Sequence, residues 1–264
     1  MEAVEKSTKK TVEETAKRII EWLKNYKETT GCRGVVLGIS GGKDSTVVAM
    51  LAKKVWGDNV VGVLMPNGQQ KDLQDSINIV KALNLRHYTV DIFNAYLSLI
   101  TSIESQLGTI ISAKSLTNIP PRLRMTTLYA IAQTLGYRVI GTGNFSEAYV
   151  GWTTKWGDSA CDFNPIAHLT CSDVMELGKY LAEEFNLDKK YVTKTPSDGL
   201  SGKSDEENFG FTYDTLDCYL TTISRNPTSP LIYDSAGRET INKIESMHSE
   251  SAHKRSLPLT INTH

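Results

Sequence analysis

Residues 40–45, Ser-Gly-Gly-Lys-Asp-Ser, place hydroxyl, glycine, lysine and carboxylate groups between two regular patterns. Residues 35–39 are apolar or glycine and predict a buried strand, and residues 46–55 predict a helix. Gly41 and Gly42 have no Cβ atom, so their N–H groups can approach an anion closely at the helix N-terminus. Such a terminus favours a negative charge by only about 0.3–1 kcal/mol. A nucleotide would therefore also need hydroxyl groups, a metal ion and basic side chains.

The order of these residues excludes a Walker A loop, which needs a hydroxyl after Gly-Lys, where Asp44 stands. The pattern Ser-Gly-Gly-x-Asp-Ser resembles the PP-loop of ATP pyrophosphatases, which split ATP between its α and β phosphates. This resemblance implies that Ser40, Ser45 and the glycine amides cradle the departing pyrophosphate, and that Asp44 holds magnesium. A plain helix N-cap after a buried strand is the alternative on these residues alone.

Three more strands are predicted at residues 59–65, 86–90 and 138–140. Helical patterns cover residues 11–29, 46–55, 73–83, 91–107, 117–136, 173–185, 213–220 and 240–247. Strands that alternate with helices predict an α/β fold, a three-layer doubly wound, mainly parallel sheet flanked by helices. Ligands bind such sheets at the carboxyl ends of strands, where residues 40–45 and 66–70 fall.

Other polar residues follow the predicted strands. Gln69 and Gln70 are candidates for the adenosine side of a pocket, with solvated loop amides as the alternative. Glu147 lies just beyond a glycine-rich turn at residues 141–144. Residues 151–162 and 195–202 show no regular period and predict loops.

The predicted helix 117–136 begins with prolines and arginines. Pro120 and Pro121 are expected in its first turn, where a missing N–H costs little. Arg122 and Arg124 are two residues apart and cannot share one helix face, so we expect them to reach different groups.

Composition limits the classes of function. A chain of 264 residues suits one α/β domain, residues 1–264, or such a domain with a helical extension. A net charge of −1 argues against a nucleic-acid partner held by a broad basic field. The four cysteines form no C-x-x-C pair, and no secretory or membrane-spanning segment is evident, so we expect reduced thiols in a cytoplasmic protein without membrane contact.

Several ordered blocks together resemble the ammonia-dependent NAD synthetases, and this likeness runs from the first helix to Pro258. The blocks are residues 40–45, 118–124, 141–147, 154–158, 162–165, 195–198 and 253–255. The resemblance implies an adenine nucleotide alpha hydrolase-like fold and a homodimer with deamido-NAD bound at the subunit interface. It also implies a two-step reaction, in which the nicotinate carboxylate of deamido-NAD attacks the α phosphorus of ATP and ammonia then displaces AMP to give NAD.

The resemblance assigns two groups of residues toward ATP. Asp44 and Glu147 would coordinate Mg²⁺ and, with Lys155, form the catalytic set. The ATP-binding set would be Gly38, Ile39, Ser40, Gly41, Gly42, Lys43, Asp44, Ser45, Thr142 and Ser197. A solvated loop carboxylate is the alternative for Glu147.

The resemblance also assigns deamido-NAD to Arg122, Lys155, Asp162, His253 and Lys254. The alternative for Arg122 and Lys155 is that they are surface charges. The alternative for His253 and Lys254 is that residues 253–255 form a solvated basic run.

Two positions depart from the family pattern. Ser197 replaces the usual threonine and keeps the hydroxyl. Cys171 stands where relatives commonly carry a lysine that contacts ATP phosphate, and a neutral thiol cannot supply that charge. Lys155 or Lys43 are the candidates to replace it, although Lys43 could also point to water.

The nitrogen donor is expected to be free ammonia, because the chain has no room for a glutaminase domain beside the sheet. The rival hypotheses are another PP-loop adenylating amidotransferase, similar to GMP synthetase, a tRNA thiolation enzyme, and a non-catalytic nucleotide-binding sensor. The rival enzymes would be expected to show different downstream sequence blocks or, for the tRNA enzyme, a basic face. Pyrophosphate release would distinguish an enzyme from a sensor.

Overall fold

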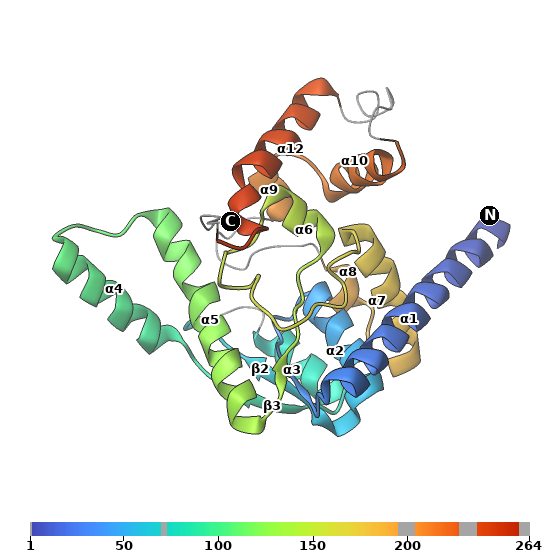
Figure 1. Cartoon of the computed structure of the whole chain (residues 1–264), viewed down its shortest axis with the longest axis horizontal. Coiled ribbons are helices and arrows are strands. Elements are labelled where there is room, and N and C mark those ends of the chain that lie inside the picture. Colours follow the sequence, from blue (N-terminus) through green and yellow to red (C-terminus); the bar gives the residue numbers. More distant parts are fainter. Residues whose placement is uncertain (1, 70–72, 195–203, 227–236, 259–264) are drawn as a thin grey trace, which may run out of the picture.

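A computed structural model describes residues 2–69, 73–194, 204–226 and 237–258 (Figure 1). Its sheet has four parallel strands in the order β3-β2-β1-β4. The strands are β1 Val35–Gly38, β2 Val60–Leu64, β3 Arg86–Thr89 and β4 Arg138–Val139. The predicted parallel α/β sheet is therefore confirmed.

The helices follow the predicted patterns closely along most of the chain. They are α1 Glu2–Thr30, α2 Lys43–Trp56, α3 Leu73–Ala82, α4 Phe93–Leu107, α5 Ala113–Leu135, α6 Phe145–Val150, α7 Cys171–Phe185, α8 Lys190–Thr193, α9 Asp205–Phe209, α10 Tyr213–Arg225 and α12 Arg238–Glu250, with 3-10 turns η1 Gly57–Asn59 and η2 Ala252–Lys254. Residues 151–162 have no helix or strand, as predicted.

Alternation along the buried strands divides the core between two faces of the sheet. Val35 and Leu37 pack with apolar residues of α1, α2, α3 and α7. Val36 and Val61 point to the other face and pack with α5. The sheet is thus the middle layer of three, as the doubly wound prediction requires.

The start of α5 corrects one prediction. The Ser112 side chain accepts a hydrogen bond from the Ser115 N–H at 3.3 Å, so the helix begins at Ala113 and not at residue 117. Pro120 and Pro121 consequently lie inside the helix and not in its first turn. The Ser112 cap satisfies an N–H group of the first turn, which stabilises a helix start upstream of the two prolines.

A second cluster of helices lies beyond the carboxyl ends of the strands. Val150, Phe209, Leu216 and Ile244 form its buried core, drawn from α6, α9, α10 and α12. Figure 1 shows these helices together at the top of the view, with α2 and the sheet below them. Within the residues described, no helix combines the length and apolar character that a membrane crossing needs.

Candidate active site

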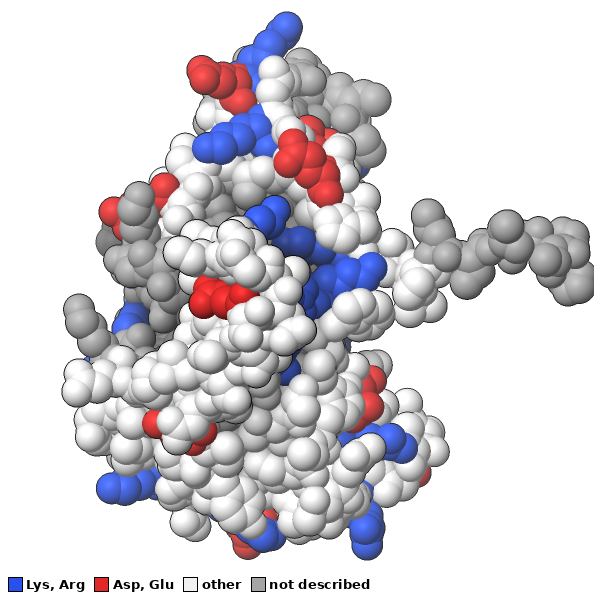
Figure 2. All heavy atoms as spheres, turned by 90° about the vertical axis from the view of Figure 1, so that its left-hand side faces the viewer, with Lys and Arg blue, Asp and Glu red and all other residues white. Residues whose placement is uncertain are grey.

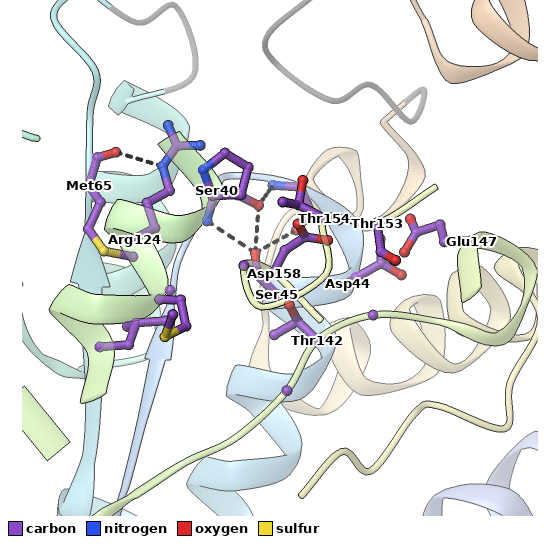
Figure 3. A pocket seen from close by; sticks show the side chains of 18 of the residues that line it. Ser40, Asp44, Ser45, Met65, Arg124, Thr142, Glu147, Thr153, Thr154 and Asp158 are labelled. Atoms are coloured by element: carbon purple, nitrogen blue, oxygen red, sulfur yellow. Dashed lines mark hydrogen bonds between the residues drawn. The ribbon is translucent and has the colours of Figure 1, made fainter. Parts of the chain in front are cut away.

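A cavity of about 570 Å³ opens between the sheet and the helices that cover its carboxyl edge. Residues that follow β1, β2 and β4 line it, together with residues of α5, the irregular 151–160 segment and η2. Figure 3 shows Asp44 and Glu147 on one side of the cavity and Arg124 on the opposite side. Lysine and arginine side chains also gather in a hollow near the centre of the face in Figure 2. The cavity therefore has one acidic side and several basic groups around it.

The 40–45 loop forms a tight turn that leads directly into α2. Gly41 has a φ of +84°, a conformation that favours glycine. The Ser40 and Ser45 hydroxyls lie 3.1 Å apart, and the Gly42 N–H donates to the Ser40 hydroxyl at 3.2 Å. The N-cap residue of α2 is Gly42, which offers no side-chain cap, so the first N–H groups of the helix suit a negatively charged ligand.

Asn144 joins the two predicted metal ligands. Its side-chain amide donates to Asp44 Oδ1 at 3.1 Å, and its side-chain carbonyl accepts from the Glu147 N–H at 3.0 Å. Glu147 Oε2 in turn accepts from the Asn144 N–H at 3.3 Å, which completes a capping box at the start of α6. No role was predicted for this fully buried asparagine. The spacing Asn-x-x-Glu, typical of a capping box at a helix start, is the signal that could have found it.

The surroundings of Glu147 disfavour its ionised form. Burial and then the nearby Asp44 charge raise the pKa of Glu147 to about 8, while Lys43 opposes this rise. Two neighbouring carboxyl groups attract a cation, and oxygen ligands of this kind suit Mg²⁺. The residues present therefore fit the predicted metal.

Lys43 points inward and not to water. The side chain is buried, and its Nζ donates to Asp44 Oδ2 at 2.8 Å. Burial opposes the charge of Lys43, but the carboxylates of Asp44 and Glu147 outweigh burial and raise its pKa. This lysine thus carries a permanent positive charge beside the phosphate loop.

Cys171 lies at the start of α7, close to the same charges. Burial raises the pKa of its thiol to about 12, although Lys43 opposes that shift. The thiol is therefore neutral and supplies no charge to a phosphate.

Four of the five predicted deamido-NAD residues come together between the irregular segment and η2, and of these four Lys254 lines the cavity. Lys155 Nζ donates to the main-chain carbonyl of His253, and Arg122 Nε donates to the Lys155 carbonyl at 3.4 Å. Lys254 Nζ donates to the carbonyls of Gly151 and Thr153 at 2.7 and 2.8 Å. The two lysines thus join the irregular segment to η2.

Asp162 is not brought into this group. It is exposed, and its Oδ2 accepts from the Val139 N–H at 2.7 Å. Thr142 lines the cavity, whereas Gln69 is exposed and does not line it. Ser197 and Gln70 lie outside the described residues.

Other residues that line the cavity were not predicted to do so. Arg124 lines it and donates from Nε to the Met65 carbonyl at 3.1 Å, away from Arg122 as the helix spacing predicts. Asp205 is buried and accepts from Trp152 Nε1 and the Tyr213 hydroxyl, both at 3.0 Å. These residues come from distant parts of the chain, and no local pattern marks them.

A parallel sheet with an anion-binding turn and a carboxylate pair at its carboxyl edge defines a nucleotide-binding α/β enzyme. A model of the family described as NAD synthase matches residues 15–258. The chain belongs to the NAD synthase family.

Individual relatives agree over nearly the whole chain. The NH(3)-dependent NAD(+) synthetase of Carboxydothermus hydrogenoformans is 37% identical over 248 residues, which cover 93% of this chain and 96% of the relative. That of Finegoldia magna is 41% identical over 216 residues, with 81% and 86% covered. Among solved structures, an NMN synthetase from Francisella tularensis is 36% identical with a TM-score of 0.83, and 95% of this chain and 98% of that chain are covered. The NH3-dependent NAD synthetase of Campylobacter jejuni is 28% identical with a TM-score of 0.77, with 95% and 99% covered.

Proposed function

We propose that this protein amidates deamido-NAD with free ammonia and ATP, giving NAD, AMP and pyrophosphate. The observation that carries the proposal is the Asp44–Glu147 pair beside an anion-binding turn, in a cavity bordered by basic residues. Family membership supports the same reaction and disfavours a sensor or a GMP synthetase-like enzyme. We treat residues 1–264 as one catalytic domain.

In the first step, a nicotinate carboxylate oxygen attacks the α phosphorus of ATP. The bond from that phosphorus to the bridging oxygen breaks, and pyrophosphate leaves. The N-terminal turn of α2 and the Ser40 and Ser45 hydroxyls are placed to hold its negative charge. The ATP site would further include Gly38, Ile39, Gly41, Gly42, Lys43, Thr142 and Ser197.

Mg²⁺ would be held by Asp44 and Glu147 and would neutralise charge on the departing phosphates. In the described part of the chain, no group of three or more histidine, cysteine, aspartate or glutamate side chains could hold a metal. Phosphate oxygens and water would therefore complete the coordination shell.

In the second step, ammonia attacks the carbonyl carbon of the adenylate and AMP leaves, carrying one former carboxylate oxygen. The protein's contribution is to position the reacting groups and to exclude water. Arg122, Lys155, Asp162, His253 and Lys254 would hold deamido-NAD, and Lys155 would also stabilise charge in the reaction.

The exposed apolar residues of α4 and of the groove between α4 and α5 support a homodimer. None of the 15 residues of α4 is buried, and Leu97, Leu99 and Leu107 are 40–64% exposed. A groove between α4 and α5 is lined by Leu107, Ile110 and Arg122, among others. We propose that a second copy covers this apolar surface and that deamido-NAD binds along it. We expect the dimer to be cytoplasmic, without nucleic-acid or membrane partners.

The test is AMP and pyrophosphate release by purified protein with ATP, Mg²⁺ and ammonium, with and without deamido-NAD. We expect release only with deamido-NAD and in a 1:1 ratio to new NAD. Release without NAD formation would contradict the proposal.

A second candidate substrate is nicotinate mononucleotide, because the Francisella tularensis relative of 36% identity is an NMN synthetase. The same assay with the mononucleotide replacing deamido-NAD distinguishes them. A higher kcat/KM for the mononucleotide would keep the chemistry and change the substrate.

A further inference from the structure

The charge of Lys43 occupies the place where a divalent ion is expected. Asp44 Oδ2 accepts from Lys43 Nζ at 2.8 Å, and Asp44 Oδ1 accepts from Asn144 at 3.1 Å. Both oxygens of this carboxylate are therefore engaged before any metal arrives. Asn144, which donates to Asp44, also accepts from the Glu147 N–H at 3.0 Å, so the second carboxyl group lies beside the same site.

The position of Lys43 is fixed from outside the loop. Its Nζ lies 5.7 Å from the centre of the Tyr213 ring, and the Tyr213 hydroxyl donates to the buried Asp205 at 3.0 Å. The lysine side chain is 2% exposed, so little water stabilises its charge. The ammonium is thus held by Asp44 and by an aromatic wall from α10.

We propose that Lys43 is the built-in counter-ion of the Asp44–Glu147 pair, which keeps bare divalent ions out of the ATP-free enzyme and transfers its contact to the triphosphate when Mg–ATP binds. The second half of this inference rests on the proposed function, and the first half does not.

Electrostatics gives the reason. A divalent ion at Asp44 would lie beside a desolvated ammonium, and like charges a few ångströms apart repel strongly in such an environment. Mg–ATP changes the balance because its phosphates bring several negative charges next to the 40–45 loop. Lysine suits this exchange because its ammonium is a point charge on a flexible stem that can change partners. The metal would accordingly enter with the nucleotide and not before it.

The experiment is a Mn²⁺ titration of the nucleotide-free protein, followed by the EPR signal of unbound Mn²⁺. We compare the wild type with Lys43→Met, which removes the charge, and with Lys43→Arg, which keeps it. Lys53→Met is the matched control, since Lys53 also lies on α2 and pairs with an aspartate, Asp58, at 3.0 Å.

We expect Lys43→Met to bind Mn²⁺ at least tenfold more tightly than the wild type, and Lys43→Arg and Lys53→Met to match the wild type. Adding Glu147→Gln to Lys43→Met should remove the gain, which places the ion at this pair. The KM for Mg–ATP should rise at least tenfold in Lys43→Met. Equal or weaker Mn²⁺ binding by Lys43→Met would overturn the proposal. If Lys43→Met fails to fold, Lys43→Gln gives the same comparison.

The Mn²⁺ titration contains no deamido-NAD and no ammonia. Its result therefore does not depend on whether the protein catalyses the amidation reaction.

Discussion

Two parts of the candidate site, a phosphate end and a C-terminal end, are built in different ways. The phosphate end comes from a short continuous segment, residues 40–45, and from the capping box between Asn144 and Glu147. The C-terminal end is joined by long-range hydrogen bonds from Lys155 and Lys254 to main-chain carbonyls. Local backbone geometry thus shapes the phosphate end, whereas the other end depends on how the C-terminal segment packs. The two ends should respond differently to mutation.

The largest effect is expected at the phosphate end. Asp44→Asn keeps the shape of the side chain but removes the charge that pairs with Lys43 and is proposed to hold Mg²⁺. We expect kcat/KM for NAD formation to fall about 10³-fold, the scale of losing one main electrostatic contact in a transition state. Asp58→Asn, in η1 just beyond the end of α2, is the control. A loss below tenfold would show that Asp44 has no main role in catalysis.

Packing of the C-terminal segment can be tested by two glycines with the same backbone conformation. Gly151 and Gly108 have φ values of +68° and +66°. An added Cβ at Gly151 would lie 2.0 Å from the Ser251 Cβ, whereas at Gly108 it meets nothing within 4 Å. Gly108→Ala should lower the free energy of unfolding by about 1 kcal/mol through its backbone angle. Gly151→Ala should lower it by about 3 kcal/mol because overpacking adds to that cost.

Urea denaturation of both glycine variants measures this difference. Equal losses would mean that the C-terminal segment is not held against Gly151.

Lys254 tests whether the C-terminal end of the site binds the dinucleotide and not ATP. Lys254→Met removes two hydrogen bonds from a charged donor, to Gly151 and Thr153. Because the ammonium is proposed to contact deamido-NAD, and a hydrogen bond to a charged group contributes about 1.5–3 kcal/mol, we expect the KM for deamido-NAD to rise about 30-fold, with little change in the KM for ATP. Lys179→Met, an exposed lysine paired with Glu176, should change neither. An equal rise in both KM values would show that the two ends are not separate.

The smallest effect concerns pH. The pKa of Glu147 is raised to about 8, so the folded protein holds a proton that the unfolded chain releases near pH 4.5. Stability should consequently fall as pH rises between these values, by at most about 1.4 kcal/mol per pH unit. The value of about 8 already includes the opposing effect of Lys43, and we expect a loss of about 2 kcal/mol between pH 6 and 8 relative to Glu147→Gln. Thermal unfolding across this range measures it, and parallel curves for the two proteins would contradict it.

The same contrast explains what the sequence could predict. The strands and the phosphate turn were predictable because apolar runs, glycines and hydroxyls there are contiguous. The start of α5 was misplaced because the signal of Ser112 competed with that of two prolines. The burial of Lys43 was not predictable, since it depends on Tyr213 from a helix far along the chain.

The C-terminal end of the site could be predicted only by resemblance to a family. Lys155 and Lys254 are bonded to carbonyls of segments about a hundred residues away, and no sequence period encodes such contacts. Asp162 matched a family position, yet it lies apart from the other four residues and bonds to β4. Its assignment to deamido-NAD stays a prediction.

The most direct test of the account follows the oxygen atoms. Deamido-NAD labelled with ¹⁸O in both carboxylate oxygens is incubated with the protein, ATP, Mg²⁺ and ammonium, and the AMP is analysed by mass spectrometry. Attack of the carboxylate on the α phosphorus predicts one ¹⁸O in each AMP and one in each NAD. Unlabelled AMP, formed together with NAD, would contradict adenylation at the phosphate end.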